Sequence, residues 1–118
     1  MYVGGNTFIL KKYLWKSGFD KVILNYIDNG VTYLGASAGT HILTKNIEHV
    51  KYFDDEIEPV EDYSGLGVFD GIIICHYNKE REKIYNQIKK HTNYKITTLR
   101  DCEYLIFDGV KWDKYIVL

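Results

Sequence analysis

The chain lacks most of the features that mark specialised classes of protein, and each shortage excludes a class. It contains one proline, one methionine and two cysteines, and its 15 basic residues nearly balance its 16 acidic residues. Without an excess of positive charge we expect neither nucleic acid nor an anionic membrane as a partner. Cys75 and Cys102 form no CxxC or Cys/His pattern, so neither a disulfide framework nor a metal site is expected. No apolar run is long enough to span a bilayer, and no secretory leader is recognisable.

What remains describes one ordinary globular domain. The 118 residues, of which 46% are hydrophobic, match the common size of a single domain that buries most of its apolar surface. We therefore expect residues 1–118 to form one domain. Free thiols favour a reducing compartment, and we expect a cytoplasmic protein whose partners are small molecules or other proteins.

Segments of strand-like and helix-like character alternate along the chain. The end of a strand is predicted at 1–3, and Asn6 or Thr7 is expected to cap a helix that stops at Gly18. A second helix is expected to begin at an Asp20 cap and to end near Gly30. The remaining predictions are a strand at 31–34, a short helix at 38–43, an irregular connection at 44–71, a buried strand at 72–75, a helix at 78–91, a strand at 94–99 and a hairpin at 104–118 turned by Asp108-Gly109. This alternation favours an α/β fold with a mostly parallel sheet flanked by helices and a C-terminal β-hairpin.

The segment Gly35-Ala36-Ser37-Ala38-Gly39 is the strongest motif. A GxSxG sequence between a strand and a helix is typical of a nucleophile elbow, a tight turn whose flanking glycines avoid a steric clash. The elbow would present the Ser37 hydroxyl at the carboxyl edge of the sheet, above the N-terminus of the next helix. The alternative is a glycine-rich turn in which Ser37 only caps that helix.

A serine nucleophile needs a base and a group that orients the base. His76 is the candidate base because it ends a buried strand at the edge where Ser37 is expected. The acid is left open between Asp101, which follows a later strand, and Asp54 or Asp55 in the long connection.

The other histidines are weaker candidates for the base. His41 is expected to point along its helix away from Ser37, while His49 and His91 are interpreted as solvated. For the oxyanion, backbone amides are expected from Ala38 and from the turn that contains Gly4 and Gly5.

Two motifs together carry a family resemblance. Gly4-Gly5-Asn6-Thr7-Phe8, followed by an apolar helix and then by the elbow at 35–39, resembles the peptidase E family of serine α-aspartyl dipeptidases, which share a fold with cyanophycinases. The resemblance implies a sheet arrangement like that of flavodoxin and class I glutamine amidotransferases, and a dipeptidase that needs no cofactor. It also implies Ser37 as nucleophile, His76 as base, and Gly5 and Ala38 as oxyanion donors, with Arg81 and Asn6 as substrate-binding residues.

The resemblance covers only part of a family member. Peptidase E proteins carry further strands and helices ahead of the glycine turn, so we expect the chain to correspond to about the C-terminal two thirds of the family fold, truncated at its N-terminus. A homodimer is one way to cover the exposed sheet edge. Two other functions stay open: a catalytically inactive remnant or regulatory module of the same fold, and a small-ligand-binding domain that uses Gly4-Gly5 for phosphate.

Overall fold

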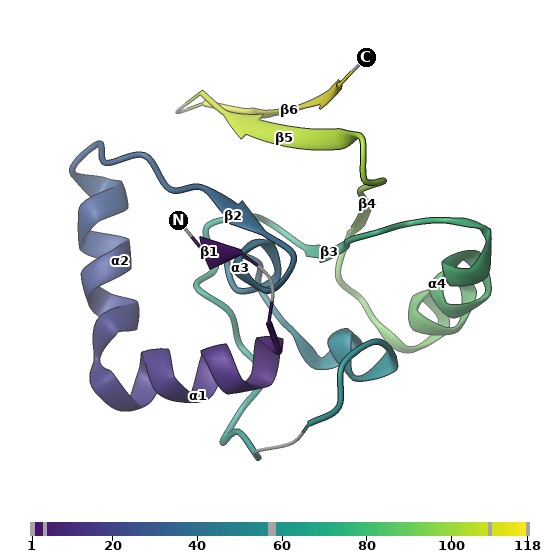
Figure 1. Cartoon of the computed structure of the whole chain (residues 1–118), viewed down its shortest axis with the longest axis horizontal. Coiled ribbons are helices and arrows are strands. Elements are labelled where there is room, and N and C mark those ends of the chain that lie inside the picture. The colour runs from purple at the N-terminus through teal and green to yellow at the C-terminus, as the bar shows by residue number, and fades with distance from the viewer. Residues whose placement is uncertain (1, 4, 57–58, 109, 118) are drawn as a thin grey trace.

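The computed structural model describes residues 2–3, 5–56, 59–108 and 110–117. Figure 1 shows α1 and α2 joined at an angle on one side, α4 on the other, and the last two strands as a separate ribbon above β2. The elements are β1 (Tyr2–Val3), α1 (Thr7–Ser17), α2 (Phe19–Asp28), β2 (Gly35–Ala36), α3 (Ala38–His41), the 3₁₀ helix η1 (Glu48–Tyr52), β3 (Ile72–Ile74), α4 (Lys79–His91), β4 (Ile96–Thr98), β5 (Glu103–Phe107) and β6 (Trp112–Ile116).

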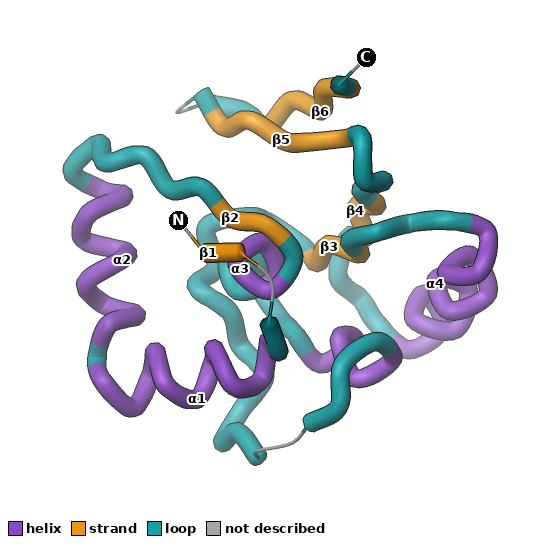
Figure 2. The backbone as a smooth tube through the Cα atoms, in the orientation of Figure 1, coloured by secondary structure: helices purple, strands orange, loops and turns teal. Residues whose placement is uncertain are grey.

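The fold is α/β, as the alternation of segments predicts. Two helical crossovers join parallel strands: β1 pairs with β2, and β3 pairs with β4 in a register that sets Ile72 opposite Ile96. β5 and β6 form the expected antiparallel hairpin. Within the described residues these pairs are separate two-stranded sheets, and Figure 2 shows how short the strands are beside the helices. No helix in this part of the chain is long and apolar enough to cross a bilayer.

Helix ends follow the sequence signals in most places. The Asn6 side chain accepts hydrogen bonds from the first amides of α1, and Gly18 ends that helix with a left-handed φ of 77°. Asn78 caps α4 by accepting from the amide of Arg81. The Asp108 side chain accepts from the amides of Val110 and Lys111 and so fixes the hairpin turn; Gly109 lies outside the described residues.

Two of the secondary-structure predictions are wrong. Asp20 does not cap α2, because that helix already begins at Phe19 and leaves Asp20 in its first turn. Residues 31–34 are not a strand, and β2 comprises only Gly35 and Ala36. The physical reason is at Val31, whose amide bonds back to the carbonyl of Tyr26 and so continues the end of α2.

β3 is the central buried strand of the described structure. Ile72 and Ile74 pack with Ile88 of α4, whereas Ile73 and Cys75 pack on the other side with Phe69 and Leu99. Successive residues of a strand point to opposite faces, so both faces are covered. This confirms the interpretation of the apolar run at 72–75 as a buried strand.

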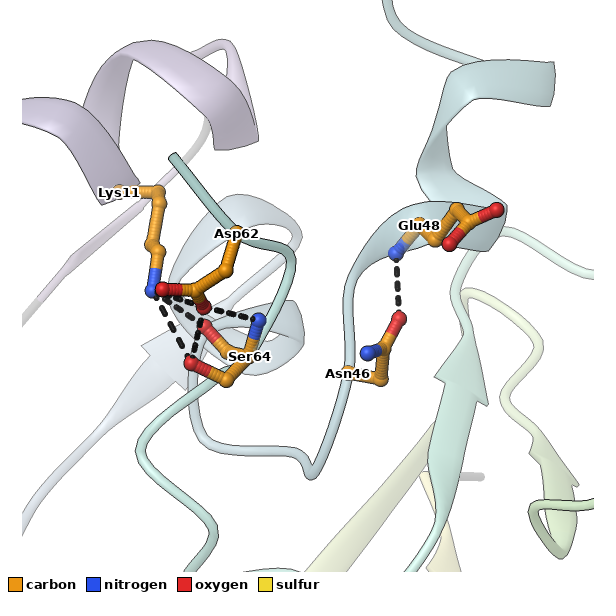
Figure 3. Close-up of polar contacts among 5 residues, drawn as sticks. All are labelled: Lys11, Asn46, Glu48, Asp62 and Ser64. Carbon is orange, nitrogen blue, oxygen red and sulfur yellow. Dashed lines mark hydrogen bonds and ion pairs between the residues drawn. The ribbon is translucent and has the colours of Figure 1, made fainter. Parts of the chain in front are cut away.

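The connection from Thr44 to Gly71 is irregular, as expected, but it is held in place at several points. Asn46 forms an isolated bridge with Ser64, and its side chain accepts from the amide of Glu48 at 2.9 Å. The buried Lys11 of α1 donates to the Ser64 carbonyl at 2.6 Å and pairs with Asp62 at 3.3 Å. Figure 3 shows the Lys11 contacts with Asp62 and Ser64, which hold this connection against α1, and the Asn46–Glu48 bond within the connection.

Candidate active site

The turn between β2 and α3 has the geometry of a nucleophile elbow. Ser37 has a φ of 52° and a ψ of −111°, a strained backbone conformation that non-glycine residues rarely adopt. A side chain at position 35 would place its Cβ 2.6 Å from the Gly39 carbonyl oxygen, so glycine is required there. The Thr40 hydroxyl closes the turn by donating to the Gly35 carbonyl at 3.0 Å.

Ser37 does not act as a helix cap. Its side chain makes no capping hydrogen bond to α3, although it occupies the N-cap position. It is half-buried at the start of a helix whose first amides have no partner within the helix. The hydroxyl therefore remains available for chemistry.

His76 and Asp101 come together directly after β3 and β4. The distance from His76 Nδ1 to Asp101 Oδ1 is 2.5 Å. A carboxylate only accepts hydrogen bonds, so Nδ1 carries the proton and Nε2 has a free lone pair in the neutral ring. His76 has a φ of 54°, and its side chain is 53% exposed. The pair can therefore meet a substrate from solvent.

The Ser37 and His76 segments are neighbours at one edge of the fold. The Cys75 thiol lies 4.0 Å from the Ser37 carbonyl oxygen, and α3 packs against β1, β2 and β3. Among the described residues, no hydrogen bond joins the Ser37 hydroxyl to the His76 imidazole.

Asp54 and Asp55 lie at the start of α1 instead. The Asp54 carboxylate accepts from the amide and from the hydroxyl of Thr7, each at 3.2 Å. Asp55 uses its backbone carbonyl, which accepts from the Asn6 side chain at 2.7 Å. Of the acids left open by the sequence, the structure brings Asp101 to His76 and brings Asp54 to Thr7.

The two expected oxyanion donors occupy different backbone settings. Ala38 is buried and begins α3, so its amide is one of the unpartnered N–H groups of a helix start. Gly5 has a φ of 81°, and a Cβ there would meet nothing within 4 Å. Glycine is therefore required at position 5 for its backbone conformation.

Arg81 and Asn6 both have defined partners within the protein. Arg81 Nη1 donates to the Cys75 carbonyl at 2.7 Å, and its guanidinium lies 4.2 Å from the centre of the Phe53 ring. Asn6 caps α1 and tethers Asp55.

Burial raises the pKa of the Cys75 thiol to about 12, so Cys75 is not an alternative nucleophile.

The sequence interpretation missed a pair of buried histidines beneath the site. His49 is buried, not solvated, and its Nε2 lies 2.7 Å from the Ile73 carbonyl oxygen. Its ring is perpendicular to that of His41, with centroids 5.8 Å apart. The His41 side chain bonds to Thr7, while its backbone amide bonds to the Ser37 carbonyl. His91 is exposed as expected. Because η1 lies in a segment without periodicity, no sequence pattern revealed the burial of His49.

The sequence also matches a known protein family. The family model described as peptidase family S51 matches residues 1–115. This chain belongs to peptidase family S51.

Individual relatives support the same assignment over part of their length. The chain is 38% identical to the uncharacterized peptidase PM1590 of Pasteurella multocida over 63% of this chain, and 39% identical to the uncharacterized peptidase Lin0382 of Listeria innocua over 64%. Each match spans only 37% of the relative. A crystal structure of a candidate peptidase E protein from Listeria monocytogenes EGD-e matches with a TM-score of 0.87 and 30% identity, covering 99% of this chain and 59% of that one.

Proposed function

We propose that this S51 chain is a serine dipeptidase that works through an acyl-enzyme, with Ser37 as nucleophile, His76 as base and Asp101 as the orienting acid. The observation that carries the proposal is the His76–Asp101 contact of 2.5 Å beside a strained elbow that leaves the serine hydroxyl free of capping bonds. Membership of a peptidase family supports hydrolysis of peptides.

In the proposed reaction, Ser37 Oγ attacks the scissile carbonyl carbon while His76 Nε2 takes the hydroxyl proton. The amides of Gly5 and Ala38 stabilise the oxyanion, and the C–N bond breaks as His76 gives its proton to the leaving amine. Water then attacks the ester, with His76 again taking a proton, and Ser37 is restored. Asp101 stabilises the imidazolium that forms in both steps.

We further propose that Arg81 binds an acidic group of the peptide. One guanidinium nitrogen is held by the Cys75 carbonyl directly before His76, and the remaining N–H groups of the fork can pair with a carboxylate. Asn6 would act on the substrate indirectly, by holding the turn that contains Gly5 through its cap of α1.

The test is covalent labelling with a fluorophosphonate, combined with turnover of dipeptides. Wild-type protein should gain one adduct, which peptide mass spectrometry locates on Ser37, and should cleave a dipeptide with an N-terminal aspartate. Ser37→Ala should lose both activities and keep its far-ultraviolet circular dichroism. Ser17→Ala is the matched control because Ser17 is exposed and its hydroxyl bonds only to the backbone of Leu14 and Phe19, where α1 meets α2.

A wild-type chain that is neither labelled nor active would contradict the enzyme proposal. That result would favour the alternative, a non-catalytic module of the same fold. Equal turnover by Ser37→Ala and wild type would exclude Ser37 as the nucleophile.

We also propose that two copies of the chain associate through the segment 31–36, and that the protein works in the cytoplasm. Val31 and Leu34 are 53% and 59% exposed, and β2 pairs only with β1 among the described residues. Exposed apolar side chains beside an open strand edge are typical of an interface.

The proposed cytoplasmic location rests on the free thiols of Cys75 and Cys102, which support a reducing compartment.

A further inference from the structure

A chain of hydrogen bonds runs beneath the candidate site and connects three segments distant in sequence. The Thr7 hydroxyl donates to Asp54 Oδ2 at 3.2 Å, and the Thr7 hydroxyl oxygen also lies 3.1 Å from His41 Nδ1. Thr7 is the first residue of α1, His41 is the last residue of α3, and Asp54 follows η1. Thr7 is fully buried and His41 is 4% exposed, so solvent does not compete for the bond between them, whereas Asp54 is half-buried.

The direction of each bond follows from the donors available. A threonine hydroxyl has one proton, which here goes to the Asp54 carboxylate, so His41 must donate its Nδ1 proton to the hydroxyl oxygen. His49 Nε2 faces the Ile73 carbonyl, which only accepts, so His49 carries its proton on Nε2. The remaining ring nitrogens, His41 Nε2 and His49 Nδ1, are buried without a hydrogen-bond partner and are unprotonated acceptors.

The three segments carry the proposed catalytic parts. Thr7 follows the turn with Gly5 by two residues, and His41 ends the helix that begins at the elbow. The His41 ring packs on His49, which bonds to Ile73 of β3, the strand that leads to His76. Buried side-chain contacts therefore connect the segments that carry the proposed oxyanion donor, the nucleophile and the base.

We propose that Asp54, Thr7 and His41 form a positioning relay that fixes the Gly5 turn relative to Ser37. The inference rests on the proposed serine peptidase function and deepens it. Asp54 is then not the acid that orients His76. It is a positioning residue whose charge strengthens both hydrogen bonds from Thr7, because ionised acceptors make stronger bonds than neutral ones. An oxyanion donor must be placed accurately to stabilise the transition state.

The first test measures the rate of acylation in variants of the relay. Asp54→Asn and Thr7→Val should lower kcat and the fluorophosphonate labelling rate about ten- to a hundredfold, the range expected when catalytic groups are misplaced, with little change in KM. Thr7→Ser keeps the hydroxyl and should retain most of the wild-type rate. Asp28→Asn, at the exposed end of α2, removes the same charge elsewhere and should leave both rates unchanged.

The second test reads the relay without using activity. Nitrogen-15 spectra of the imidazole rings should show His41 as the Nδ1–H tautomer in the wild-type protein, and Thr7→Val should shift it toward Nε2–H. Amide exchange at Thr7 should accelerate in Asp54→Asn, since the Thr7 amide donates to that carboxylate. Urea unfolding shows whether each variant is folded.

The outcomes separate the two proposals. Wild-type labelling rates in folded Asp54→Asn and Thr7→Val, or an Nε2–H tautomer of His41 in the wild type, would overturn the relay. Absence of labelling in the wild type would instead refute the peptidase proposal, and the tautomer and exchange measurements would still decide whether the relay exists.

Discussion

Two residues carry unusual backbone strain, and both are proposed catalytic residues. Ser37 and His76 are the non-glycine residues with positive φ in the described part of the chain. Such conformations cost about 1–3 kcal/mol each and persist only where neighbouring contacts enforce them. For Ser37 these contacts include the Thr40 bond to Gly35, and for His76 they include the Asp101 carboxylate. The strain places both side chains at the exposed end of their strands.

The buried histidines make stability depend on pH. Burial, together with the nearby His49, Arg81 and His76, lowers the pKa of His41 to about 3. Burial also lowers the pKa of His49, against the opposing effect of its bond to Ile73. In the unfolded chain a histidine binds a proton near pH 6.5. Below that pH the unfolded state binds more protons, so stability is full above pH 6.5 and falls as the pH drops toward 3.

We predict that the free energy of unfolding falls as the pH is lowered from 7.5 to 5. Below pH 6.5, each buried histidine should contribute a decrease of up to about 1.4 kcal/mol per pH unit. Urea unfolding at several pH values measures this slope. His41→Gln and His49→Gln should each reduce the slope, whatever they do to stability at neutral pH. His91→Gln, at an exposed position, should keep the wild-type slope. A slope unchanged in all three variants would contradict the assignment.

The secondary-structure elements bring the site together by connecting parallel strands. In each crossover unit the strands run in one direction, so their carboxyl ends meet at one edge of the sheet. Ser37 follows β2, His76 follows β3 by two residues, and Asp101 follows β4 by three. The starts of the helices complete the arrangement, because α1 follows the Gly5 turn and α3 begins at Ala38.

The cap of α1 is therefore expected to matter for stability. Asn6 Oδ1 accepts from the amides of Phe8 and Ile9 at 2.9 and 3.2 Å. Asn6→Ala should lower the free energy of unfolding by about 1 kcal/mol, the usual cost of losing an N-cap, as measured by urea unfolding. Asn6→Asp keeps the accepting oxygen and should be nearly neutral, while Asn93→Ala, in an exposed loop, serves as control. If Asn6→Asp were as destabilising as Asn6→Ala, the bond to Asp55 and not the cap would dominate.

At the scale of the whole molecule, much apolar surface is left open. Val31 and Leu34 beside β2 are more than half exposed, and so are Ile116 at 59% and Val117 at 63% in the C-terminal segment. In the crystal structure from Listeria monocytogenes EGD-e, the part that matches this chain makes up 59% of the whole chain. An apolar surface of this kind marks a contact with further polypeptide, for which we propose a second copy of the chain.

We predict that the wild-type chain is dimeric and that Val31→Ser combined with Leu34→Ser makes it monomeric. Because these side chains are mostly exposed in one copy, the monomer itself should lose little stability. Sedimentation velocity over a range of concentrations measures the mass. Val110→Ser, at 88% exposure in the hairpin turn, is the control and should stay dimeric. A wild-type monomer at every concentration would exclude association of two copies and would indicate a different polypeptide as the partner.

Local features of this protein follow from its amino-acid residues alone. The glycines of the elbow, the Asn6 and Gly18 helix ends and the apolar run at 72–75 each predict their structure, because a steric or hydrogen-bonding rule acts over a few residues. The same rules failed for 31–34, since an apolar run gives no sign that its first amide bonds back to the preceding helix.

The pairing of each acid with its partner depends, in contrast, on how the elements pack together. Asp54 and Asp101 are equally plausible companions of His76 in the sequence, and the packing of η1 against α1 takes one to Thr7 while the β3–β4 crossover takes the other to His76. The burial of His41 and His49 was likewise decided by packing. The physical reason is that side chains dozens of residues apart meet only after the strands and helices have closed around a common core, and no local pattern encodes that distance.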